Sequence, residues 1–250
     1  MSKSTNNIAI SLTNVSKTFK IDVKDFRNKN VLQTFLLFFK KRPKHSLKAL
    51  SGINLEIKKG ETLGIIGRNG SGKSTLVKIM SGVYFPDSNG EVIKNGRSIL
   101  MSLKVGMNNE LTARQNIYVN GSALGLKIKE IDNVFDDIIE FAELEEFVDS
   151  TTKNFSNGMV AKLSFSIAIN SKAEIMFLDE VFAVGDQSFK KKAIKAIENN
   201  WLDGRTVVIV SHSMGLIKQY CDRVLYLKDG KIEYLGEPEK AISLYDQTID

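Results

Sequence analysis

The spacing of apolar and polar residues predicts that this 250-residue chain begins with strands and continues into helices. Residues Ile8 to Phe19 alternate and are rich in β-formers, which predicts a first strand, and Gly52 to Ile57 predict a second. Two more strands are expected at Gly90 to Asn95 and Ser98 to Leu103, on either side of a turn at Gly96. The first part of the chain is therefore expected to hold several strands.

A block of helices follows these strands. From about Gly106 to Ser171 apolar residues recur at helical spacing, in segments at Thr112 to Leu124, Ile131 to Phe141, Leu144 to Val148 and Val160 to Ile169. Strands are predicted before and after this block, so we expect it to be an insertion into an α/β core.

Continuous apolar runs after the helical block predict buried strands. Ala173 to Glu180 and Thr206 to Ser213 each hold four consecutive apolar residues, as is typical of parallel strands covered on both faces. The end of the chain predicts a hairpin and a short helix, at Val224 to Leu227, Lys231 to Leu235 and Pro238 to Tyr245.

One segment, from about residue 22 to 47, stands apart from this pattern. Its residues Val31 to Phe39 put apolar side chains on one face of a helical wheel, and the basic cluster Lys40 to Lys44 follows. Two interpretations stay open for this amphipathic helix. It packs on its own domain, or it lies at an anionic membrane surface or against a membrane partner.

Composition narrows the class of protein. Hydrophobic residues make up 42% and charged residues 26% of the chain, which is ordinary for a globular protein, and the length fits one large domain. The single Cys221 excludes an internal disulfide. No run approaches the roughly 20 apolar residues that a membrane span needs, and no signal sequence is expected. A net charge of +6 permits a nucleic acid or an anionic membrane as a neighbour.

A glycine-rich motif lies between an apolar run and a helix-forming run. Gly67, Gly70, Gly72, Lys73 and Ser74 fit the pattern G-x-x-x-x-G-K-[ST], the phosphate-binding loop. Glycines let the backbone turn tightly and point successive N–H groups at an anion, next to the positive end of the helix dipole. The motif therefore predicts a nucleotide site.

Each position of this loop has an expected contact. Residues Asn69 to Ser71 and Gly72 form the cradle for the phosphates. Lys73 is expected to contact the β and γ phosphates, Ser74 to bind Mg²⁺, and Thr75 to reach the α phosphate.

Polar residues at the ends of the two buried strands complete the site. Asp179 is expected to hold Mg²⁺, and Glu180 beside it is a candidate base for an attacking water. His212 ends the following apolar run and is interpreted as a contact to the γ phosphate. Carboxyl ends of parallel strands are where open α/β sheets bind ligands, which supports grouping these residues.

Taken in order, these motifs resemble those of the nucleotide-binding subunits of ATP-binding-cassette transporters. The phosphate loop is followed by F-S-N-G-M at Phe155 to Met159, I-M-F-L-D-E at Ile175 to Glu180, A-V-G-D at Ala183 to Asp186, and then His212. The resemblance implies an α/β P-loop NTPase with a RecA-like parallel-sheet core, an antiparallel β subdomain and an inserted helical subdomain. We expect one domain, its core at about residues 1–105 and 172–250 and its helical part at about 106–171.

The resemblance also implies further nucleotide contacts. Ser156, Asn157 and Gly158 correspond to the family's signature loop, which serves the ATP held by the opposite subunit, so a homodimer with two ATP molecules is implied. Asp186 belongs to the next motif. Asn108 falls where the family has a metal-contacting glutamine and has a shorter side chain with the same amide. Phe19 matches the aromatic residue that stacks on adenine, with His45 and Phe39 as alternatives.

Within the family, the sequence is similar to ATPases that export lipid-linked polysaccharides such as O antigen, capsule and teichoic acid. This similarity is carried by N-E-L-T-A-R-Q-N-I-Y-V-N-G at residues 109–121, F-S-N-G-M at 155–159 and D-E-V-F-A-V-G-D-Q-S-F at 179–189. The amphipathic segment before the phosphate loop is also similar to one found in those exporters. This similarity implies a separate membrane permease as partner, a peripheral location at the cytoplasmic face of the inner membrane, and no nucleic acid. The end at Asp250 leaves no expected room for a C-terminal carbohydrate-binding domain. An importer, a drug exporter or a nucleic-acid-associated cassette ATPase are the alternatives.

Overall fold

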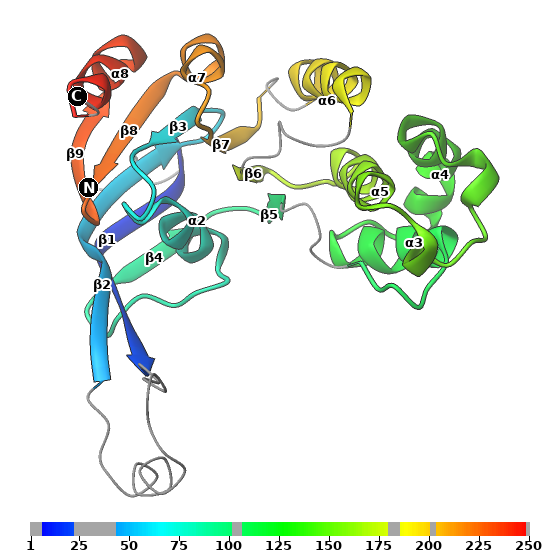
Figure 1. Ribbon diagram of the computed structural model, residues 1–250, viewed down its shortest axis with the longest axis horizontal. Helices are drawn as coiled ribbons and strands as arrows, with labels where there is room; N and C mark the ends of the chain where they lie inside the picture. Colours follow the sequence, from blue (N-terminus) through cyan, green and yellow to red (C-terminus); the bar gives the residue numbers. More distant parts are fainter. Residues whose placement is uncertain (1–6, 23–43, 102–106, 180–185, 201–203, 249–250) are drawn as a thin grey trace, which may run out of the picture.

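The computed structural model describes residues 7–22, 44–101, 107–179, 186–200 and 204–248 (Figure 1). In chain order the elements are β1 (Ile8–Asp22), β2 (Lys44–Lys58), β3 (Thr62–Ile66), α2 (Lys73–Ser81), β4 (Glu91–Lys94), β5 (Ser98–Met101), α3 (Ala113–Ala123), α4 (Ile128–Ala142), η2 (Glu145–Phe147), η3 (Thr152–Asn154), α5 (Asn157–Ile169), β6 (Ile175–Asp179), α6 (Gln187–Asn200), β7 (Thr206–Val210), α7 (Met214–Tyr220), β8 (Arg223–Lys228), β9 (Lys231–Gly236) and α8 (Pro238–Asp246).

Two sheets form the core. One is antiparallel with strand order β2-β1-β4, and the other has the order β5-β6-β7-β3-β8-β9. The second sheet is parallel from β5 to β8, and β9 runs antiparallel at its edge. The β3 strand lies inside this sheet and all five of its residues are buried, so the segment that follows it starts from a rigid base.

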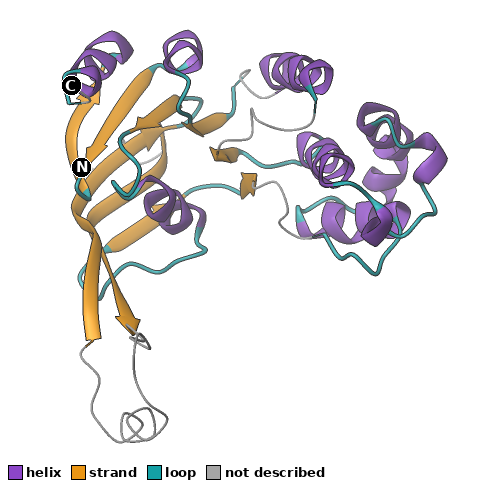
Figure 2. Cartoon of the chain, viewed as in Figure 1, coloured by secondary structure: helices purple, strands orange, loops and turns teal. Residues whose placement is uncertain are grey.

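Helix α2 lies between the two sheets (Figure 2). Its buried residues Leu76, Val77, Ile79 and Met80 join a cluster with residues of β1 and β2 on one side and of β3, β6, β7 and β8 on the other. Each fully buried aliphatic side chain contributes about 1.5 to 3 kcal/mol. This packing fixes the helix, and therefore its N-terminus, relative to both sheets.

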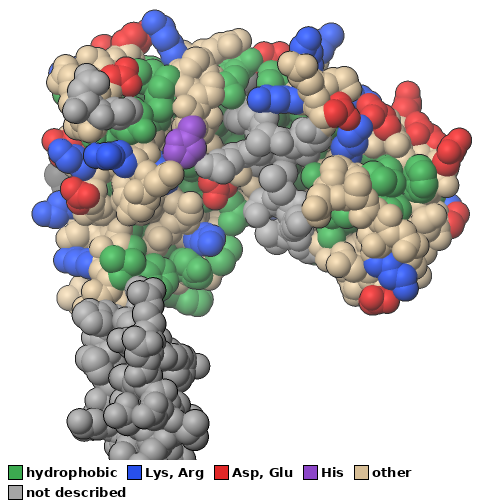
Figure 3. All heavy atoms as spheres, in the orientation of Figure 1, with side chains coloured by type: hydrophobic (Ala, Val, Ile, Leu, Met, Phe, Trp, Pro, Cys, Tyr) green, Lys and Arg blue, Asp and Glu red, His purple; other side chains and the backbone are tan. Residues whose placement is uncertain are grey.

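Helices α3, α4 and α5 form a helical lobe beside the core (Figure 1). They share a cluster of their own that includes Ile117, Ile131, Ile138 and Leu163. Helix α5 also packs on the core, because Phe165 belongs to the cluster of β6, α6 and α7. Acidic side chains gather on the outer side of the lobe, around α4 (Figure 3).

The predicted fold class is confirmed, and several elements differ from expectation. Strands β1 and β2 extend to Asp22 and back to Lys44, because they pair with each other over their whole length. The segments around Gly96 do not form one hairpin: β4 pairs with β1, whereas β5 pairs with β6 in the other sheet. Helices α6 and α7 were not expected.

The predicted helix of the 22–47 segment lies outside the described residues. Among those that are described, no helix is both long enough and apolar enough to cross a membrane.

Candidate functional site

The phosphate loop connects β3 to α2 and is held close to two neighbouring strands. Gly72 has φ 105°, and a Cβ built there would lie 2.5 Å from the backbone oxygen of Ala49 in β2. A Cβ at Gly67 would lie 2.3 Å from the backbone oxygen of Leu227 in β8. Only glycine combines this backbone conformation with this close approach, so both glycines are required by the packing of the loop.

The Lys73 side chain lies along the loop. Its side-chain nitrogen donates hydrogen bonds to the backbone oxygens of Gly67 at 2.7 Å and Arg68 at 3.0 Å, and the residue is only 8% exposed. The first turn of α2 contains no acidic residue that would neutralise the positive end of the helix dipole. The ammonium group, the helix terminus and the loop amides therefore gather positive charge at one point.

A cavity of about 480 Å³ lies beside this loop. Its lining includes nine of the predicted site residues: Phe19, Asn69, Gly70, Gly72, Lys73, Ser74, Thr75, Asp179 and His212. They come from four separate parts of the chain, namely β1, the loop with α2, β6 and the segment after β7. The fold therefore brings together most of the residues that the sequence predicted for a nucleotide.

Asp179 and His212 reach the cavity because β6 and β7 are adjacent and parallel. Asp179 is opposite Val210 in the register, so the carboxyl ends of both strands meet at the same edge. Glu180 follows Asp179 in the sequence and lies outside the described residues.

The oxygen donors of this cavity suit a magnesium ion. Ser74 supplies a hydroxyl and Asp179 a carboxylate, both hard oxygen donors. The described residues contain no group of three or more His, Cys, Asp or Glu side chains arranged as a metal site. Mg²⁺ is usually held by one or two protein oxygens together with substrate phosphates.

Phe19 lies at the rim of the same cavity. Its ring packs edge-to-face on Tyr84, with centroids 5.6 Å apart, and the ammonium of Lys17 lies 5.7 Å from its centroid. These contacts fix a partly exposed aromatic ring where a base could stack. Phe39 and the side chain of His45, the alternatives to Phe19, lie outside the described residues.

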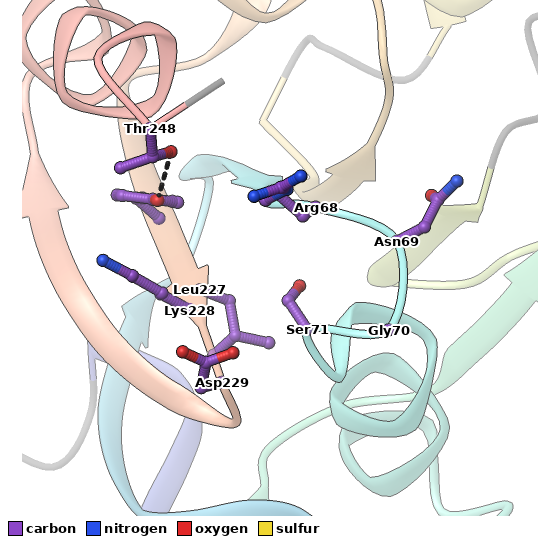
Figure 4. A pocket seen from close by; sticks show the side chains of 9 residues that line it. Arg68, Asn69, Gly70, Ser71, Leu227, Lys228, Asp229 and Thr248 are labelled. Carbon is purple, nitrogen blue, oxygen red and sulfur yellow. Dashed lines mark hydrogen bonds between the residues drawn. The ribbon is translucent and has the colours of Figure 1, made fainter. Parts of the chain in front are cut away.

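Ser71 lines a neighbouring cavity of about 570 Å³ instead (Figure 4). This cavity lies between the phosphate loop and β8, with Thr248 at its far side. The Ser71 hydroxyl is buried and has no hydrogen-bond partner among the described residues. The contribution of Ser71 to the loop is therefore its backbone, whose carbonyl accepts from Gly230 N–H at 3.0 Å.

Ser156, Asn157 and Gly158 do not line the cavity of their own chain. They form the start of α5, where the Ser156 hydroxyl accepts a hydrogen bond from Met159 N–H at 3.1 Å. Both Ser156 and Asn157 are exposed.

Asn108 and Asp186 also lie away from the cavity lining. The side-chain oxygen of Asn108 accepts from Glu110 N–H at 3.0 Å, which stabilises the turn before α3. One carboxylate oxygen of Asp186 accepts from the Ser188 hydroxyl and from Phe189 N–H, at the start of α6. Those hydrogen bonds, with a smaller effect of Lys162, hold the pKa of Asp186 well below its usual range.

Comparison with known proteins identifies this arrangement. The family model described as ABC transporter matches residues 50–183. This chain belongs to the ABC transporter family. The match confirms the resemblance and the expected enzyme class, an ABC-type ATPase.

Relatives and solved structures agree with that assignment. The teichoic acids export ATP-binding protein TagH of Listeria innocua is 37% identical over 97% of this chain and 71% of its own length. The O-antigen export system ATP-binding protein RfbB of Klebsiella pneumoniae is 40% identical over 86% of this chain and 89% of its own. A dimeric, post-hydrolysis structure of the ATP-binding cassette MJ0796 with ADP and Pi matches with TM-score 0.70 and 24% identity, covering 92% and 98% of the chains. The last likeness shows the fold.

Some residues of this ABC cassette cavity were not predicted. Ala49, Asp229 and Gly230 line it, and the last two lie at the turn of the predicted hairpin between Val224–Leu227 and Lys231–Leu235. A Cβ at Gly230 would lie 2.7 Å from the same Ala49 oxygen that restricts Gly72. The glycine turn at Asp229 and Gly230 was the sequence signal that could have indicated these residues. The turn lies close to the phosphate loop because β8 pairs with β3, and these two strands are far apart in the sequence.

Proposed function

We propose that this chain is the ATP-hydrolysing subunit of a bacterial transporter that exports a lipid-linked polysaccharide, with O antigen as the specific cargo. The observation that carries the proposal is the cavity beside Lys73, combined with export proteins for teichoic acid and O antigen among the relatives.

ATP binds along the phosphate loop in this proposal. The loop amides and Lys73 neutralise the β and γ phosphates, since these groups already gather positive charge at one point. Thr75 reaches the α phosphate, and Phe19 stacks on the adenine. His212 contacts the γ phosphate from the end of β7.

Hydrolysis needs a base and a charge clamp. Ser74 and Asp179 would hold Mg²⁺, which when bound supplies charge stabilisation for the phosphates. Glu180 is proposed to accept the proton of the attacking water, and general-base assistance is typically worth about 100- to 10,000-fold in rate. Asn108 is proposed to approach this metal only when its exposed turn moves.

Two copies of the chain close over two ATP molecules. Support comes from Ser156, Asn157 and Gly158, which are absent from the cavity lining of their own chain. The start of α5 is an N-terminal helix end without an acidic residue, a suitable contact for the γ phosphate of the other copy. Closure stabilises only the ATP-loaded pair, so hydrolysis reopens it.

The partner of this pair is a separate permease in the inner membrane. The subunit is proposed to sit at the cytoplasmic face, attached through that permease. Acidic side chains on the outer side of the helical lobe (Figure 3) oppose nucleic-acid binding there, despite the net positive charge of the chain.

The experiment is to co-purify the chain with its permease and measure ATP turnover with added lipid-linked glycans. O-antigen precursor should stimulate turnover, and matched membrane lipids without the glycan should not. Stimulation by teichoic acid precursor alone would replace the specific cargo and keep the exporter. Stimulation by neither glycan would refute polysaccharide export in favour of another transporter class.

Two substitutions test the nucleotide chemistry. Glu180→Gln should bind ATP and dimerise but turn over hardly at all. Lys73→Ala should fail earlier, at nucleotide binding, because it removes the charge that meets the phosphates. Parental hydrolysis by Glu180→Gln would remove Glu180 from the role of base.

A further inference from the structure

Four charged side chains link the helical lobe to α6; we call Glu143, Lys162, Asp186 and Lys192 the Lys162 cluster. The Lys162 ammonium on α5 lies 2.5 Å from a carboxylate oxygen of Glu143 and 3.1 Å from one of Asp186. Lys192 on α6 lies 3.6 Å from the other oxygen of Glu143. The cluster therefore joins three elements, namely the end of α4, the middle of α5 and the start of α6.

Lys162 is enclosed as well as paired. Its side chain is only 14% exposed, and its ammonium lies 5.1 Å from the ring centroid of Phe189. Phe189 is fully buried and packs against Phe165 of α5, with centroids 5.8 Å apart. Lys162 thus covers the junction at which α5 and α6 meet, and its position depends on both helices.

Asp186 is engaged through both carboxylate oxygens. One oxygen accepts the hydrogen bonds at the start of α6, from Ser188 and Phe189, and the other faces Lys162. A displacement of α5 that carries Lys162 away would therefore pull on the first turn of α6. In the opposite direction, Asp186 transmits the position of α6 to α5.

We infer that Lys162 is a positioning residue for ATP hydrolysis, because it fixes α5, which follows its N-cap Ser156, against Asp186, which directly precedes α6. The inference rests on the proposed function, in which Ser156 and Gly158 contact the ATP of the other copy. Lys162 itself does not line the nucleotide cavity. Its loss should therefore disturb the alignment of the closed pair and leave the binding of ATP to its own loop intact.

The test uses the full chain with Lys162→Met, Lys162→Arg and a matched control, Lys172→Met. Lys172 pairs with Glu130 on the surface, where its side chain is 58% exposed. Turnover and ATP affinity are measured over a range of protein concentrations. Lys162→Met should lower kcat by about 10- to 100-fold, since a displacement near 1 Å can cost about 100-fold. The KM for ATP should change by less than about threefold, because ground-state binding is retained.

Rescue separates positioning from general damage. Lys162→Arg keeps a charge that can pair with two carboxylates and should recover most of the turnover, and Lys172→Met should match the parent. Asp186→Asn keeps a good helix cap but loses the charge. The double variant with Lys162→Met should therefore lose no more than the larger single loss.

Three results would overturn the inference. They are parental kcat in Lys162→Met, a fall in ATP affinity that accounts for the lost turnover, and no rescue by arginine in a folded protein. If Lys162→Met fails to fold, Asp186→Asn carries the same test with Asp149→Asn as its matched control, since Asp149 pairs with Arg114 at 2.8 Å on the surface of the lobe. Failure of the proposed function, in which two copies close on ATP, is distinguishable, because turnover per chain of the parent would then not depend on protein concentration.

Discussion

Alanine at Gly72 would place a methyl group against the backbone of β2. Its φ of 105° is unfavourable for a residue with a Cβ, which costs about 1 to 2 kcal/mol. The methyl group would also lie 2.5 Å from the Ala49 oxygen and 2.9 Å from Leu50 Cδ2. Forcing extra volume into such a contact costs about 1 to 3 kcal/mol.

Together these effects should destabilise Gly72→Ala by about 2 to 5 kcal/mol. For a domain of this size, each kcal/mol lowers Tm by about 2 to 4 °C, so a fall of about 4 to 20 °C is expected. Scanning calorimetry or circular dichroism of the purified chain without nucleotide measures the shift.

Gly70→Ala is the matched control, because it lies in the same loop. Its φ is 84°, and no heavy atom in the described part of the chain lies within 4 Å of a Cβ built there. Only the backbone cost of about 1 to 2 kcal/mol applies to it. If both variants have the same Tm, the close approach of the loop to Ala49 does not restrict the residue type at position 72.

Three further predictions concern charge and burial. Arg223→Met should destabilise the chain by about 3 kcal/mol in urea, because it leaves the Glu61 carboxylate, 7% exposed and 2.6 Å from Arg223, without its ion partner. Adding Glu61→Gln should recover part of that loss, and a double variant as unstable as the single one would contradict the reasoning. Burial, with a smaller effect of Asp222, raises the pKa of Cys221 to about 12. Iodoacetamide at pH 8 should therefore label this thiol only after the chain unfolds, and mass spectrometry measures the labelling. Because the pKa of Asp186 is lower in the folded than in the unfolded chain, its carboxylate stabilises the fold at any pH above its unfolded pKa of about 3.9. That stabilisation is lost as the pH falls from there through the folded pKa. Asp186→Asn should therefore be less stable than the parent at pH 6 and approach it toward pH 3; a constant gap would exclude this linkage.

Local features of the sequence predicted which residues lie together beside the phosphate loop. The glycine spacing from Gly67 to Gly72 and the apolar run before Asp179 each specify a short piece of backbone whose chemistry depends on adjacent residues. Their meeting also followed, since parallel strands place their carboxyl ends together. Positions that depend on distant pairing did not follow. Ala49 reaches the phosphate loop only because β2 continues past the length that its own sequence predicts.

Helix α6 shows a signal that was present and overlooked. Phe189, Ala193, Ala196 and Ile197 are buried and recur at helical spacing. The lysines between them make the segment polar on average, which conceals a narrow apolar stripe. By contrast, α7 contributes one fully buried residue, Ile217, and its seven residues are too few to show a helical repeat of apolar positions.

Two kinds of interaction meet at the junction of α5 and α6. Apolar packing holds the helical lobe on the core, and ion pairs set its orientation. Burial of an aromatic side chain such as Phe165 or Phe189 contributes about 1.5 to 3 kcal/mol, whereas partly exposed ion pairs add little to stability. Apolar packing, however, is non-directional and permits small rotations of one helix on another. The ion pairs of Lys162 with Glu143 and Asp186 are directional and span all three elements. Loss of Lys162 should therefore change the rate of hydrolysis more than the stability of the fold, and an equal loss of both would mean that this charge only supports packing.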